Sequence, residues 1–149
     1  MYNKILFATD GSEISKRATE KIVELYKNWK CDVVVFHSLV HQVIHDMMLI
    51  SSTGSNSYYT SEYVNEEKDV YRVLRETKEF LEAAGVPVEA RLVREYEPDE
   101  YIIKSVKDEN FDLVVLGVKG IHSMLKEIDI GSVPQKVLKH ISCDVLLIY

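Results

Sequence analysis

The chain has 149 residues, of which 46% are hydrophobic and 28% charged, and its formal net charge is −6. These values predict one globular domain spanning residues 1–149, and they argue against a general nucleic-acid-binding surface. No apolar run is long enough to cross a membrane, and no signal peptide precedes the first strand-like run. The two cysteines are too few for a disulfide framework, so we expect a cytoplasmic protein.

Apolar runs and helical periodicity alternate along the first half of the chain. Ile5 to Ala8 reads as a short buried strand, and Ser12 is a suitable N-cap for an amphipathic helix that continues to Trp29. Asp32 to Phe36 is β-branched and apolar on both faces, which is typical of a parallel strand covered by helices. Residues 41–61 could form a short helix or a loop, and they include a small, polar segment.

The second half continues the alternation. A long helix is expected from Glu62, with Gly85 as its C′ residue, and Val86 to Val93 alternates like a half-exposed edge strand. Pro98 opens a further helix. The remaining predicted elements are a strand at 113–116, a loop at 121–130, a helix at 132–140 and a strand at 143–148.

This order predicts an α/β fold with five parallel strands and helices between them. The chain ends on the apolar strand Cys143 to Ile148, which would leave an uncovered sheet edge. Pairing with the same strand of a second subunit would cover that edge, so the sequence predicts a homodimer.

The most informative stretch carries three glycines. An apolar strand runs into Gly117 and Gly120, and Gly131 precedes the last helix. Glycines allow sharp turns and a close approach of the backbone to a ligand, and a helix N-terminus can bind phosphate. Ser132 and Gln135 are expected to form a capping box at that helix, whether or not a ligand binds.

Ligands of open α/β sheets bind beyond the carboxyl ends of the strands, where the strand order reverses. If the first and fourth strands are neighbours, Asp10 is placed for a ribose, and Ala8 and Ser38 for a flat base. Asp10 and Ser12 could instead simply cap the first helix, and the glycines could simply turn the chain. The gathering of these features at several strand ends favours a ligand site.

At these residues the chain resembles the universal stress protein family over almost its whole length. The resemblance rests on the opening Lys4 to Ser12, on Asp112-Leu-Val-Val-Leu-Gly117, on Gly131-Ser132-Val133 and on the closing apolar strand. It implies a single-domain five-stranded parallel sheet in the order 3-2-1-4-5, with helices on both faces, of the adenine nucleotide alpha hydrolase-like type. It also implies a homodimer.

One branch of the family binds ATP through glycines spaced Gly-x2-Gly-x9-Gly-Ser/Thr. Here the second spacer has ten residues, and Asp129 within it would repel a triphosphate, although a loop can absorb an insertion. By position, the resemblance and the strand-end geometry together make these residues the candidates for binding ATP: Ala8, Thr9, Asp10, Ser38, Leu116, Gly117, Lys119, Gly120, Gly131, Ser132 and Val133. Asp10 and Ser132 could lie on the side of a Mg²⁺ ion.

We therefore expect an ATP-binding dimeric regulator of stress or energy state. The alternative is a dimeric interaction module of the same fold that binds no nucleotide. The sequence indicates no dedicated enzyme and supports at most slow ATP hydrolysis, because it offers no clear base and no arginine near the glycines. The first strand lacks the Gly-x-Gly-x-x-Gly of a dinucleotide oxidoreductase and the acidic cluster of a receiver domain.

Histidines and cysteines outside this site are expected to be structural. His37, His41 and His45 follow at four-residue steps, but His37 should end a strand, so a solvated or loop role is favoured over a metal site. Cys31 and Cys143 each begin a strand at the opposite end from the candidate site and read as small, buried or half-buried thiols. A pairing of Cys143 with His140 stays open.

Overall fold

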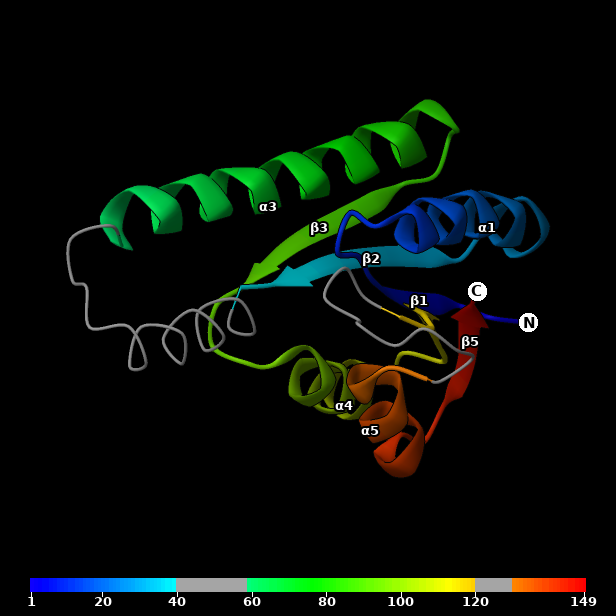
Figure 1. The fold of residues 1–149 in the computed structure, drawn as a ribbon. Helices are drawn as coiled ribbons and strands as arrows, with labels where there is room; N and C mark the ends of the chain where they lie inside the picture. Colours follow the sequence, from blue (N-terminus) through cyan, green and yellow to red (C-terminus); the bar gives the residue numbers. More distant parts are fainter. Residues whose placement is uncertain (40–58, 120–129) are drawn as a thin grey trace.

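The protein is an α/β fold built on one parallel sheet (Figure 1). The computed structural model describes residues 1–39, 59–119 and 130–149, with side chains described outside 59–66. Within these ranges five strands pair in the order β3-β2-β1-β4-β5, which confirms the expected topology. The strands are β1 Lys4–Ala8, β2 Asp32–Ser38, β3 Val88–Val93, β4 Leu113–Gly117 and β5 Asp144–Ile148.

Helices cover both faces of the sheet. In Figure 1, one face carries α1 and α3, and the other carries α4 and α5. The helices are α1 Glu13–Trp29, α3 Tyr59–Ala83, α4 Pro98–Glu109 and α5 Ser132–His140. Within the described ranges, no helix is both long and apolar enough to cross a bilayer.

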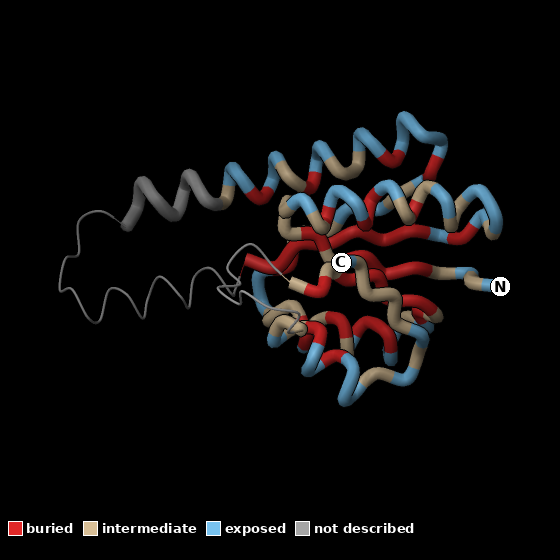
Figure 2. Tube along the Cα trace, turned by 45° about the vertical axis from the view of Figure 1, so that its right-hand side comes forward, coloured by how far each residue is buried: buried red, intermediate tan, exposed pale blue. Residues whose placement is uncertain are grey.

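One apolar core lies on each face of the sheet, between the strands and the helices that cover them. Figure 2 shows the buried residues following the strands. Side chains alternate between the faces because a strand has a period of two residues. The core under α1 and α3 contains Ile5, Phe7, Val33, Val35, Leu74 and Leu81. The core under α4 and α5 contains Leu6, Val34, Phe36, Ile102, Val114 and Val137.

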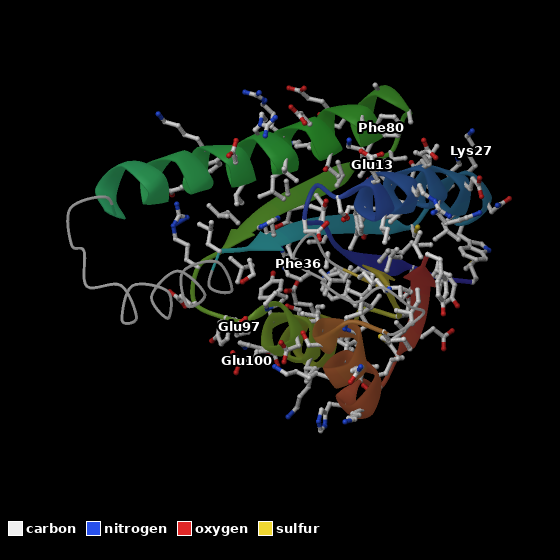
Figure 3. The ribbon with its side chains drawn as sticks, in the orientation of Figure 1. Glu13, Lys27, Phe36, Phe80, Glu97 and Glu100 are labelled. Atoms are coloured by element: carbon white, nitrogen blue, oxygen red, sulfur yellow. The ribbon has the colours of Figure 1, made fainter. Side chains whose placement is uncertain are left out.

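The helix boundaries follow from local capping. Ser12 is the N-cap of α1 as predicted, and its hydroxyl accepts a hydrogen bond from Ser15 N at 3.1 Å. Figure 3 shows Glu97 and Glu100 together at the start of α4, where Glu97 N donates to Glu100 Oε2 at 3.3 Å. Gly85 follows α3 with a φ of +80°, as a C′ glycine should.

Most predicted elements are confirmed, with small shifts of their ends. Helix α3 begins three residues before the predicted Glu62, and β3 begins after Pro87, since proline lacks the N–H that a ladder needs. The predicted edge position of β3 is correct. The predictions for 41–61 and 121–130 fall almost entirely outside the described residues.

Candidate functional site

The carboxyl ends of the three inner strands meet at one edge of the sheet. β1 lies between β2 and β4, which is the condition that the expected site required. Thr9 N, just past β1, donates to Phe36 O of β2 at 3.0 Å. The ends of β1 and β2 are therefore joined beyond Ala8 and Phe36, the last pair of their ladder.

The turn at residues 9–12, called the Asp10 turn below, is built around one carboxylate. Asp10 Oδ1 accepts hydrogen bonds from Ser12 N at 3.0 Å and from Ser15 Oγ at 2.6 Å. These bonds tie the turn to the first turn of α1. The helix-capping role that the sequence allowed for Asp10 and Ser12 is therefore present, and a role toward a ribose is a separate proposal.

Gly117, the last residue of β4, lies close to α1. A Cβ atom at this position would be 2.8 Å from Ile14 Cγ2 and 3.2 Å from Lys119 O. Real Cβ atoms do not approach other atoms to 2.8 Å, so the packing of β4 against α1 requires a glycine here. The sequence pattern did not reveal this structural reason, because it depends on a contact between residues 14 and 117.

Gly131 connects α5 to the end of β4. Its N–H donates to Val118 O at 2.8 Å, and Val118 N donates in turn to Ile148 O of β5 at 2.8 Å. A Cβ atom on Gly131 would be 3.1 Å from Val118 O, which is a tight contact. The α5 N-terminus is thus placed beside the carboxyl edge of β4.

The predicted capping box at α5 is wrong. Gly131 is the N-cap, with φ −60° and ψ 164°, and Ser132 is the first helical residue. Gln135 Nε2 donates to Ile130 O at 2.6 Å, away from the position that a capping box requires. The helix itself begins at Ser132 as predicted, and its N-cap Gly131 is held by the backbone bond to Val118.

The N-terminus of α5 presents backbone N–H groups that the helix itself does not bond. Pro134 has no N–H, and Gln135 N bonds to Gly131 O at 3.1 Å. In the part of the chain that the structure describes, the N–H groups of Ser132 and Val133 have no acceptor. Two unpaired N–H groups and the positive end of the helix dipole suit an anion such as phosphate.

The other expected site residues differ in accessibility. Ser38 is buried, and its hydroxyl donates to Tyr96 O at 2.6 Å, so it holds the connection between β3 and α4. Thr9 and Leu116 are also buried, whereas Ala8 and Lys119 are half-buried at the strand ends. Gly120 lies outside the described residues.

His37 lies near the end of strand β2, as the sequence predicted. The solvated or loop role favoured for it is wrong, because the residue is only 7% exposed. Burial lowers the pKa of the imidazole, and this effect is partly offset by the charge of Asp10 and by a hydrogen bond with the Thr9 backbone. The signal that could have revealed its burial is the unbroken apolar run before it.

The cysteines behave as predicted. Cys31 is buried and Cys143 is half-buried, and they belong to opposite faces of the sheet. Burial raises the pKa of Cys31, and burial with the nearby Asp144 raises the pKa of Cys143 to about 11. Within the described residues, Cys143 Sγ donates its hydrogen bond to Asp144 O at 3.5 Å and not to His140. Among the described residues there is also no group of acidic, histidine or cysteine side chains that could hold a metal.

Comparison with known proteins assigns this architecture to one family. The sequence matches the model of the universal stress protein family over residues 1–148. It is 32% identical to the universal stress protein YxiE of Bacillus subtilis, with 99% of both chains covered. It is also 32% identical to the universal stress protein MJ0577 of Methanocaldococcus jannaschii, over 99% of this chain and 95% of that protein.

Solved structures agree with the fold. The structure of MJ0577 superposes with a TM-score of 0.76 at 28% identity, covering 99% of this chain and 96% of that one. A universal stress protein in complex with cAMP gives 0.69 at 21% identity, covering 99% and 97%. One from Archaeoglobus fulgidus in complex with dAMP gives 0.68 at 21%, covering 99% and 98%.

Proposed function

The chain belongs to the universal stress protein family, and we propose that it binds ATP at the carboxyl edge of its sheet and acts as a dimeric regulator of stress or energy state. The observation that carries the proposal is the pair of N–H groups of Ser132 and Val133 beside the end of β4, which have no acceptor among the described residues. Solved relatives of the same fold contain cAMP or dAMP, which supports an adenine nucleotide as the ligand class.

In this proposal each part of the edge has one task. The start of α5 binds the phosphates through Gly131, Ser132 and Val133. Gly117 and Lys119 would line the same region, and Gly120, outside the described residues, is assigned to it by its place in the glycine pattern. A Mg²⁺ ion held by the phosphates would lie near Asp10 and Ser132. The ribose and base would meet the ends of the inner strands at Ala8, Thr9, Asp10, Ser38 and Leu116. No residue is assigned a catalytic role.

The experiment is acid extraction of the purified protein for bound nucleotide, followed by titration of ATP and AMP with Mg²⁺. The decisive variant is Ser132→Pro, which removes one N–H donor at the first helical position, where proline is well tolerated. The extended conformation of Gly131, with ψ 164°, is the one that a residue before proline prefers. Ser132→Ala is the matched control, since it removes the hydroxyl and keeps the N–H.

We expect Ser132→Pro to weaken ATP binding by about 10- to 100-fold, because a hydrogen bond to a charged group contributes about 1.5–3 kcal/mol. Ser132→Ala should keep most of the affinity. Full affinity in Ser132→Pro would place the phosphates elsewhere, and no binding by the unmodified protein at millimolar ATP would refute the nucleotide itself.

The dimer is proposed from the exposed edge of β5. Among the described strands β5 pairs only with β4, and its apolar residues Val145 to Ile148 are only half-buried. An uncovered apolar edge strand favours pairing with another chain. Light scattering at micromolar concentration tests the dimer, and a monomeric mass would refute it.

We also infer a cytoplasmic location, because Cys31 and Cys143 are free thiols on opposite faces of the sheet.

A second function is favoured by two observations. The carboxylate of Asp10 is already bonded to α1, and Gly117 is required by its contact with Ile14. Both residues thus have structural roles without a ligand, as expected for an interaction module of this fold that binds no nucleotide. The ATP titration separates the two functions.

A further inference from the structure

Asp99 is a buried carboxylate in the first turn of α4. It is 7% exposed, and among the described residues no other aspartate or glutamate, and no lysine or arginine, is buried. A carboxylate that leaves water needs a partner, because burial penalises its charge. Its partner is Lys136 of α5, whose Nζ lies 3.3 Å from Oδ2 and 3.5 Å from Oδ1. This ion pair joins α4 to α5, which pack side by side (Figure 1).

The start of α4 is a fixed support for this carboxylate. Ser38, at the end of β2, donates its hydroxyl to Tyr96 O at 2.6 Å and so ties the segment before α4 to the sheet. Glu97 and Glu100, labelled in Figure 3, form the capping box of the helix. Because the first turn is held to the sheet and closed on itself, Asp99 is presented from a well-defined position.

Helix α5, in contrast, has few directional contacts. It has nine residues, and those that it buries are apolar. Apolar contacts hold a helix against the core but do not set its direction sharply. Within the described residues, two polar contacts tie the helix and its N-cap to the rest of the fold. One is the 2.8 Å bond from Gly131 N to Val118 O, and the other is the ion pair of Lys136 with Asp99.

These two ties lie on either side of the candidate phosphate site, by which we mean the N–H groups of Ser132 and Val133. Gly131 directly precedes them, and Lys136 lies one turn after Ser132. Two separated ties fix the direction of a helix, whereas a helix held at one point can pivot about it. Hydrogen bonds weaken steeply when the donor is misaligned, so the direction of the N–H groups matters to an anion.

We propose that Asp99 is a positioning residue of the candidate phosphate site: by holding Lys136 it keeps α5, and with it the N–H groups of Ser132 and Val133, in the direction seen in the structure. Asp99 itself touches no ligand in this role. Its effect on ATP rests on the proposed function, whereas its effect on the direction of α5 does not.

The charge of Asp99 gives the proposal a distinctive sign. A carboxylate paired with the helix that binds phosphate repels an anion, so by charge alone its removal strengthens ATP binding. Removal would also release the ammonium of Lys136 to attract the anion. A positioning role has the opposite consequence, because the donors of Ser132 and Val133 lose their alignment when the tie is lost.

The first test uses the ligand-free protein. The backbone amide resonances of Ser132 and Val133 are compared by NMR in the unmodified protein and in Asp99→Asn. The control is Asp108→Asn, which removes a carboxylate of the same helix whose partner, Lys104, also belongs to α4. We expect both amides to move in Asp99→Asn and to stay in place in Asp108→Asn.

Unmoved amides in Asp99→Asn, or equal shifts in Asp108→Asn, would overturn the proposal. If Asp99→Asn does not fold, two variants of the exposed Lys136 decide instead. Lys136→Met loses the ion pair and should move both amides, while Lys136→Arg keeps the pair and should leave them in place. Equal spectra of these two variants at Ser132 and Val133 would contradict the mechanism.

The second test is titration of ATP with Mg²⁺ into the unmodified protein, Asp99→Asn and Asp108→Asn. We expect Asp99→Asn to bind about 3- to 10-fold more weakly, the range for a residue that acts on a site without touching the ligand. Asp108→Asn should bind like the unmodified protein. Equal or tighter binding by Asp99→Asn overturns the link from Asp99 to the nucleotide. If the unmodified protein binds no ATP, the proposed function fails, and the amide comparison still decides whether Asp99 positions α5.

Discussion

Gly11 offers a quantitative test of how the Asp10 turn is built. It has a φ of +76°, and a Cβ atom on it would be 2.7 Å from Val73 Cγ2 of α3. Gly85 has a nearly equal φ of +80°, but no atom lies within 4 Å of its Cβ position. Substitution by alanine therefore strains the left-handed backbone at both glycines. Only at Gly11 does the new Cβ atom also overlap with a side chain of α3.

The shared cost is the left-handed backbone, about 1–2 kcal/mol, reduced by about 0.4–1 kcal/mol because alanine also restricts the unfolded chain. Gly85→Ala should therefore destabilise the protein by about 1 kcal/mol. Gly11→Ala adds the overlap with a β-branched side chain, and overpacking costs about 1–3 kcal/mol. We expect a total of about 2–4 kcal/mol, with the midpoint of thermal unfolding lowered by about 5–12 °C for a chain of this size.

The assay is urea denaturation, monitored by circular dichroism, of a double-mutant cycle that combines Gly11→Ala with Val73→Ala. Removing the valine methyls makes room for the new Cβ, so Gly11→Ala should cost only about 1 kcal/mol in that background. Equal costs in the two backgrounds, within about 0.5 kcal/mol, would show that the contact between the turn and α3 does not limit position 11. Equal costs for Gly11→Ala and Gly85→Ala would lead to the same conclusion.

Three further outcomes are expected. Hydrogen bonds from Arg91 lower the pKa of Glu109 to about 2, so Glu109→Gln should lower the free energy of unfolding by about 1–2 kcal/mol at pH 7. In denaturation curves, this difference between the two proteins should fade as the pH drops from about 4.5 to about 2, because the carboxylate of the unmodified protein becomes protonated. With its pKa raised to about 11, Cys143 should react with a thiol reagent at pH 7 far more slowly than a free cysteine, and rapid labelling in the native state would contradict its burial. Gly117→Ala should lower the unfolding midpoint because its Cβ meets Ile14, and unchanged stability would remove the structural reason for this glycine.

The order of elements could be predicted from the sequence because its signals are local. Apolar runs such as Ile5 to Ala8 define strands, and the cap at Ser12 defines where α1 begins. The resemblance to a family supplied the strand order, which local signals do not contain. The bounds of α5 were predicted correctly, but its N-cap is Gly131 and not Ser132, and Gly131 is held by a hydrogen bond to Val118 that the local pattern does not contain.

The roles of the site residues were decided by contacts across the fold. His37 is buried because its strand lies inside the sheet and α3 covers that face, and the apolar run before it is only an indirect sign of this. Gly117 is required by Ile14, and Gly11 by Val73, pairs far apart along the chain. The sequence alone therefore determined the fold class, and it predicted the edge of the sheet that we propose as the ligand site. Only the tertiary structure decided which of those residues support the edge and which backbone donors remain available, because both depend on side chains that meet only when the sheet and helices pack together.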